Sequence, residues 1–171
     1  MRMLLAVLFI VISGCATGKE LIESDISVNP DLELIFTEYR YSIAEINRCI
    51  QVPGLCLKNG TPVFGAVSYP PRTYLQGLKL RYKDTVYNLN TQNMYNADVK
   101  GVRTEKGVVE YFYASCYDKK NCIVRGIFSD AGGSYVAEWN IIDGVPIRTM
   151  LTSSADIVHK FLEDIKPPVY E

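Results

Sequence analysis

Apolar residues recur with a period of two along much of the second half of the chain. Between residues 78 and 82 every second residue is apolar, and the residues between them are basic. Further β-forming runs occupy residues 85–89, 107–115, 122–128, 134–141 and 145–152. The pair Asp143-Gly144 separates the last two runs and favours a tight hairpin. The pattern predicts an antiparallel β-meander of about five to seven strands with one buried face.

An earlier segment has helical spacing instead. Asn29-Pro30-Asp31 combines a capping side chain, a proline and an acidic residue, as many helix starts do. The apolar residues after it recur every three or four positions: Leu32, Ile35, Phe36, Tyr39, Ile43 and Ile46. This spacing predicts an N-terminal amphipathic helix of about five turns. A strand is the alternative, because Ile35, Tyr39, Tyr41 and Ile43 share one parity.

A second helix is expected near the C-terminus. The residues Ser153-Ser154-Ala155-Asp156 resemble a capping box, and the apolar stripe after them contains Ile157, Val158, Phe161, Leu162 and Ile165. Pro167-Pro168 should end this helix, because proline cannot donate a backbone hydrogen bond. The expected fold class is therefore α+β, in which an N-terminal and a C-terminal helix flank the antiparallel meander.

The first fifteen residues have the layout of an export signal. Arg2 precedes the uninterrupted apolar run Met3–Ile12, and small residues follow. A spanning helix needs about 20 apolar residues, so this run is too short to anchor the protein by itself. Ile12-Ser13-Gly14-Cys15 resembles the lipobox of bacterial lipoproteins, with Ile12 where leucine is usual. An ordinary cleaved signal peptide with a chance cysteine is the alternative.

The resemblance implies that the peptide before Cys15 is removed and that Cys15 carries acyl chains such as palmitate. Several chains give stable anchoring, whereas a single chain binds a membrane only marginally. Ala16 follows the cysteine, and in this family a residue other than aspartate there implies transport to the outer membrane. We therefore expect a signal peptide over residues 1–14, a lipidated tether over residues 15–28 and a single periplasmic domain over residues 29–171.

Four further cysteines are present: Cys49, Cys56, Cys116 and Cys122. Export would place them in an oxidising compartment, where paired cysteines form disulfides. Of the three pairings, we favour Cys49–Cys56 and Cys116–Cys122, because each pair encloses a short loop of turn residues. A four-thiolate zinc site is the alternative, but the spacings lack the close cysteine pair of a zinc knuckle.

The composition limits the chemistry. The 18 basic and 19 acidic residues nearly cancel, so no overall positive field would recruit nucleic acid. The single histidine, His159, is expected on the closing helix, which leaves no histidine-based metal site. No motif indicates a cofactor. A glycan hydrolase that uses Glu110 and Glu138, with Asp130 nearby, is the remaining catalytic hypothesis, although both glutamates also suit the wet face of a sheet.

Tyrosine is abundant, with twelve residues, and tyrosine is enriched at protein interfaces. Tyr87, Tyr95 and Tyr117 flank predicted loops, so we expect them to form a partner-binding surface. Lys79, Arg81 and Lys83 make a basic stripe, from which Arg81 could steer a partner. The alternative for this stripe is an edge strand that is kept soluble by charge.

These features favour a non-catalytic binding module over an enzyme. We expect an outer-membrane lipoprotein that faces the periplasm, where it binds a protein as an inhibitor or immunity-like factor. The alternative is an assembly or pilot lipoprotein of an envelope or secretion complex. Lipoproteins that inhibit lysozymes or confer immunity to toxins are similar in size and disulfide use, but their motifs are absent here, so the likeness is one of kind.

Overall fold

The computed structural model describes residues 20–40, 50–52, 55–58, 60–66, 71–99, 109–129 and 131–168 of the 171-residue chain. The predicted signal peptide and the lipobox with Cys15 lie outside the described residues. Cys49 lies outside them as well, and with it the predicted Cys49–Cys56 disulfide. No helix in the described part of the chain is long and apolar enough to cross a membrane.

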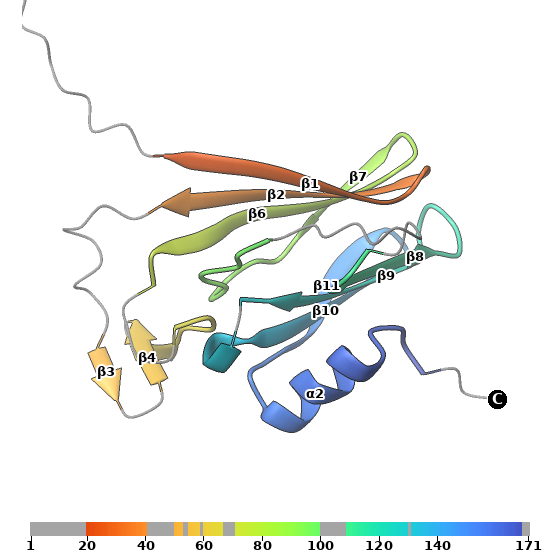
Figure 1. Ribbon diagram of the computed structural model, residues 1–171. Helices are drawn as coiled ribbons and strands as arrows, with labels where there is room; N and C mark the ends of the chain where they lie inside the picture. The colour runs from red at the N-terminus through yellow and green to blue at the C-terminus, as the bar shows by residue number, and fades with distance from the viewer. Residues whose placement is uncertain are drawn as a thin grey trace, which may run out of the picture.

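Two antiparallel sheets of four strands face each other (Figure 1). The first sheet contains, in order, β1 (Leu21–Asn29), β2 (Leu32–Arg40), β6 (Thr73–Tyr82) and β7 (Thr85–Leu89). The second is a meander of β8 (Phe112–Cys116), β9 (Cys122–Phe128), β10 (Tyr135–Ile142) and β11 (Val145–Thr152). A small third sheet of β3 (Ile50–Val52), β4 (Leu55–Lys58) and β5 (Thr61–Pro62) comes between β2 and β6 in sequence. The 3-10 turn η1 (Ala131–Gly133) precedes β10, and the helix α2 (Ala155–Glu163) follows β11.

The main core lies between the two four-stranded sheets. Alternate side chains point inward along most of β2, β6 and β10, and Leu34, Phe36, Leu80 and Trp139 are among those that are fully buried. The Trp139 indole N–H donates to the carbonyl oxygen of Asn90 at 2.9 Å. This bond satisfies the polar atom of a buried ring and joins the second sheet to the segment after β7.

The predicted N-terminal helix is wrong, because residues 32–40 form strand β2. Leu32, Leu34 and Phe36 alternate inward and pair with β6 on one side and β1 on the other. Asn29-Pro30-Asp31 is a turn between strands, in which the Asn29 side chain accepts a hydrogen bond from the Asp31 amide at 2.9 Å. The same side-chain oxygen can cap a helix or a turn, so the local signal did not distinguish the two.

The predicted tether needs a matching correction. Residues 21–28 belong to β1, which pairs with β2 along its length and buries Ile26 against the main core. The fold is thus largely antiparallel β, with two four-stranded sheets and one short C-terminal helix in the described residues, and not the expected α+β arrangement of two flanking helices. The four C-terminal strands lie close to the predicted runs.

Helix α2 covers half of the outer face of the second sheet. Val158 and Phe161 pack on Ile127 of β9 and Val136 of β10, forming a second apolar cluster. The predicted capping box does not form: Ser154 is the N-cap residue, but its side chain makes no capping hydrogen bond. Leu162 was expected in the apolar stripe and is instead exposed. The covered half is the one remote from the β10–β11 turn, because Val136 lies near the start of β10.

Candidate protein-binding surface

Two of the three tyrosines predicted to bind a partner lie in the core. Tyr87 and Tyr95 each expose only 8% of their surface. Tyr87 shares its inward parity with Leu89 on β7. Tyr95 packs with Val63 and Ala66, and its carbonyl oxygen accepts a hydrogen bond from the Tyr135 hydroxyl at 3.1 Å. Neither ring is available to a partner, so this part of the prediction is wrong.

Arg81 is not the free steering charge that the sequence suggested. Its guanidinium forms an ion pair with Glu33, which lies opposite it on β2. The basic stripe also does not mark an edge strand, because β6 lies between β2 and β7. The register places Asp25 of β1, Ile35 and Lys79 in one row across this outer face. The outer face of the first sheet therefore carries charges of both signs.

Tyr117 is the predicted tyrosine that is exposed, with 93% of its surface accessible. It begins the five-residue loop between Cys116 and Cys122, called the clipped loop below because a disulfide joins these two cysteines. The disulfide confirms the second predicted cysteine pair. Inside the loop, the Tyr117 amide donates to the carbonyl of Asn121 at 2.9 Å.

Asp118 organises the inside of the clipped loop. One carboxylate oxygen accepts hydrogen bonds from the backbone amides of Lys120 at 2.7 Å and Asn121 at 2.8 Å, and the Asn121 side chain donates to both oxygens. The Lys120 amide and the Asn121 side chain hold the pKa of Asp118 below its ordinary value, because these bonds favour the charged form.

Two hairpin turns from each four-stranded sheet meet at one end of the molecule, called the turn end below. The Lys83 amide donates to the carbonyl of Asp31 at 2.9 Å, which joins the β6–β7 turn to the β1–β2 turn. Lys119 of the clipped loop forms an ion pair with Asp84 at 2.6 Å. The Gly144 amide donates to the carbonyl of Lys120 at 2.9 Å, which adds the β10–β11 turn. Four turns from two sheets are thus held as one surface.

Exposed aliphatic side chains lie beside the clipped loop on β10 and β11. Ile142, Val145 and Ile147 expose 52%, 58% and 47% of their surface. Ile142 pairs with Val145, and Ile147 pairs with Asn140, so all three project from the outer face of the second sheet. This is the half of the face nearest the turns, which α2 does not cover. Together with Tyr117 they form the apolar part of the turn end.

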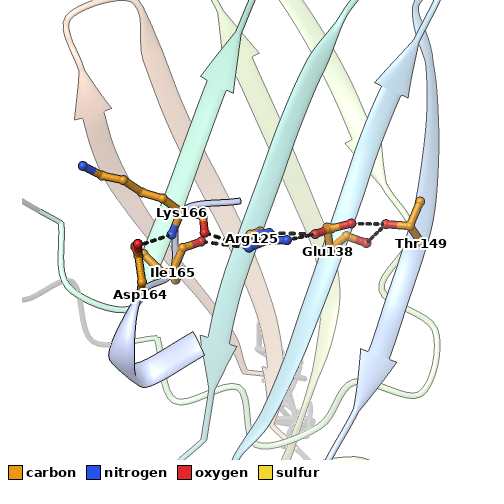
Figure 2. A network of polar contacts seen from close by, with 6 residues as sticks. All are labelled: Arg125, Glu138, Thr149, Asp164, Ile165 and Lys166. Carbon is orange, nitrogen blue, oxygen red and sulfur yellow. Dashed lines mark hydrogen bonds and ion pairs between the residues drawn. The ribbon is translucent and has the colours of Figure 1, made fainter. Parts of the chain in front are cut away.

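A polar network separates the covered half of this face from the exposed half (Figure 2). Arg125 of β9 donates from Nε and Nη2 to one carboxylate oxygen of Glu138, each at 2.7 Å. The other oxygen accepts a hydrogen bond from the Thr149 hydroxyl at 2.8 Å. Arg125 Nη1 also donates to the carbonyl of Lys166 at 3.0 Å, and the guanidinium lies 4.9 Å from the ring centre of Phe161. The network attaches the segment after α2 to the sheet.

Glu138 is therefore not on a wet face, as the sequence suggested, since its side chain and that of Arg125 are each only 12% exposed. Glu110, the other proposed catalytic glutamate, accepts a hydrogen bond from the Tyr111 hydroxyl, which raises the pKa of that phenol. Asp130 lies outside the described residues.

His159 is on the exposed side of α2, with Nε2 3.2 Å from a carboxylate oxygen of Glu163. Among the described residues no group of histidine, cysteine or acidic side chains could hold a metal ion.

Neither a family model, nor a curated protein, nor a solved structure matches this chain.

The turn end was only partly predictable from the sequence. The clipped loop and the Asp143-Gly144 turn were predicted, and the inward parity of Ile141 implies that Ile142 faces outward. What the sequence did not reveal is that α2 stops short of this half of the sheet.

Proposed function

We propose that this protein is an envelope-anchored lipoprotein that acts as a non-catalytic protein-binding module, of an inhibitor or immunity-like kind, and that it binds its partner through the turn end. The observation that carries the proposal is that Tyr117, Ile142, Val145 and Ile147 are all exposed on or beside turns that are bonded to one another. An aromatic residue beside aliphatic residues, with polar groups around them, is the usual anatomy of an interface.

The energies are of the right order for an interface of modest size. Covering the exposed half of an isoleucine or valine side chain would contribute roughly 1 kcal/mol, and covering a whole tyrosine ring would contribute roughly 4 kcal/mol. The apolar part of the turn end could then supply about 7 kcal/mol before costs. Association itself costs about 4–15 kcal/mol, so a surface that is already ordered, as the bonded turns are, has a clear advantage.

The position of the turn end agrees with an anchor at Cys15, which the sequence predicts. Leu21, at the start of β1, pairs with Tyr39, whereas the β1–β2 turn lies at the other end of the pair. The chain thus enters the domain at the end remote from the turns (Figure 1). Only a few residues join Cys15 to β1, so the anchored domain would direct its turn end away from the bilayer and toward the periplasm.

An assembly or pilot role in an envelope or secretion complex is the second candidate, and it uses the same surface. The two roles differ in the partner, which would be a single toxin or hydrolase in the first case and a component of a membrane complex in the second. In a hydrolase, Glu138 would have to act while its carboxylate accepts hydrogen bonds from Arg125 and Thr149.

The proposal can be tested by chemical cross-linking in intact cells, followed by solubilisation in detergent and recovery of the tagged protein. A triple variant, Ile142→Ser, Val145→Ser and Ile147→Ser, should lose the cross-linked partner, while a triple serine variant of exposed α2 residues, Asp156→Ser, His159→Ser and Leu162→Ser, should retain it. Equal recovery of the partner by both variants would refute the assignment of the turn end. The identity of the partner would decide between the two roles.

A further inference from the structure

We infer that the clipped loop inserts into a concave, acid-lined site of the partner protein, with Tyr117 as the anchor and the Lys120 ammonium as the charged contact. The inference rests on the proposed function and adds the shape and the charge of the partner's site. It follows from three observations. The Tyr117 ring is exposed, the loop is held by a disulfide and hydrogen bonds, and the Lys120 ammonium has no ion-pair partner among the described residues.

The projection of Tyr117 indicates the shape of the site. At 93% exposure the ring has almost no contact with the rest of the described chain, although such rings are usually partly covered in a folded domain. A flat surface would cover one face of a ring that projects this far, whereas a pocket covers both faces and the edge. Binding energy concentrates in side chains that fill such pockets.

The loop is held in one shape before any partner binds. The Cys116–Cys122 disulfide closes its base, and Asp118 accepts hydrogen bonds from the two backbone amides near its tip. The Gly144 amide fixes the loop from outside through the carbonyl of Lys120. A loop that is ordered in advance loses little conformational entropy on binding, which suits insertion into a site of fixed shape.

The charges of the loop indicate the chemistry of the site. The Asp118 carboxylate is directed into its own loop, and the Lys119 ammonium is paired with Asp84. Lys120 is exposed, and no ion pair joins its ammonium to a carboxylate in the described part of the chain. Among the described residues, the loop therefore presents one ammonium without an ion-pair partner near a phenol, although the Asp118 carboxylate is close enough to interact with it electrostatically. Complementary charge favours the correct partner and rejects others, so the site should contain acidic side chains.

An anionic lipid surface could also attract an exposed tyrosine beside a lysine. The geometry favours a protein, because β1 enters the domain at the end opposite to the turns (Figure 1). With the proposed anchor on that side, the clipped loop would be directed away from the membrane that holds the protein.

The test is site-specific photo-cross-linking of the full-length protein in its own cells. The photoreactive amino acid benzoylphenylalanine replaces Tyr117 in one variant, Val145 in a second and His159, on the exposed side of α2, in a control. Each variant is then combined with Lys120→Glu, or with Lys166→Glu as the matched charge reversal on an exposed lysine remote from the clipped loop. Cross-linked peptides are mapped by mass spectrometry.

We expect residue 117 to cross-link to one protein, at residues that line a concave site with aspartate or glutamate side chains. Lys120→Glu should lower the yield about tenfold, and Lys166→Glu should leave it unchanged. Cross-links from residue 145 without any from residue 117 would overturn the insertion while the proposed function stands. Cross-links from 117 to lipid, or to a convex or basic protein surface, would also overturn it. Absence of protein cross-links from both 117 and 145 would refute the proposed function as well.

Discussion

Replacement of Arg125 by methionine should destabilise the protein by about 3–5 kcal/mol, the usual cost of removing one member of a buried ion pair. Both side chains of the Arg125–Glu138 pair are only 12% exposed, so solvent screens the pair little. The variant leaves the Glu138 carboxylate with the Thr149 hydroxyl as its remaining side-chain donor in the described network. It also removes the hydrogen bonds from Arg125 to the carbonyls of Ile165 and Lys166.

The unpaired charge of Glu138 in this variant leads to a second expectation. If most of the loss comes from the charge that is left unpaired, the double variant Arg125→Met with Glu138→Met should recover at least half of it, because an apolar pair needs no counter-charge. The assay is urea denaturation of the purified chain in mild detergent, followed by circular dichroism, with Arg40→Met as the control. Arg40 forms an exposed pair with Glu20, so its loss should cost at most about 1 kcal/mol.

A cost for Arg125→Met below about 1 kcal/mol would show that the network is open to solvent and that the segment after α2 is not fixed by it. A double variant that is less stable than Arg125→Met alone would contradict the explanation by an unpaired charge. In that case the lost contact between Arg125 and Phe161 would carry the effect. Glu138→Gln should leave biological function nearly intact, since no proton transfer is proposed there, and loss of function in a folded, partner-binding variant would revive the hydrolase hypothesis.

Four further outcomes are expected. Cys15→Ser should move the protein from the outer-membrane fraction to the soluble envelope fraction, and a variant that still fractionates with membranes would show that Cys15 is not the anchor. Tyr87→Ala should cost roughly 3 kcal/mol in denaturant unfolding because its ring is buried, whereas Tyr117→Ala should change stability by at most about 0.5 kcal/mol; similar effects of the two would contradict the assigned burial. Non-reducing peptide mapping should recover Cys116 linked to Cys122, and two alkylatable thiols there would disprove the link. Because the folded pKa of Asp118 is lowered, the order of the clipped loop should be complete above the ordinary aspartate pKa and lost as the pH falls through the folded value, which hydrogen exchange at the Lys120 and Asn121 amides would detect; protection that does not change with acid would exclude Asp118 as its cause.

Local signals in the sequence determined the C-terminal half of the fold. The strands β9 and β11 coincide with the predicted runs. Apolar alternation with a period of two indicates strands with one buried face, and the pair Asp143-Gly144 favours a hairpin turn between them. The Cys116–Cys122 disulfide was likewise predictable, since the turn residues between the cysteines bring them together within one hairpin. These features depend on residues that are close in sequence.

Tertiary structure decided what the local pattern left open. Residues 32–40 satisfy both periods, and only pairing with β1 and β6 selects the strand. The same pairing converts residues 21–28 from an expected tether into an edge strand.

The exposure of each tyrosine was decided in the same way. Tyr95 is buried because a second segment packs against it through Val63 and Ala66. Tyr117 remains exposed because no described element reaches it. A sequence specifies which side chains prefer burial, but the surface left to a partner depends on which elements cover which face, and this is a property of contacts between distant residues.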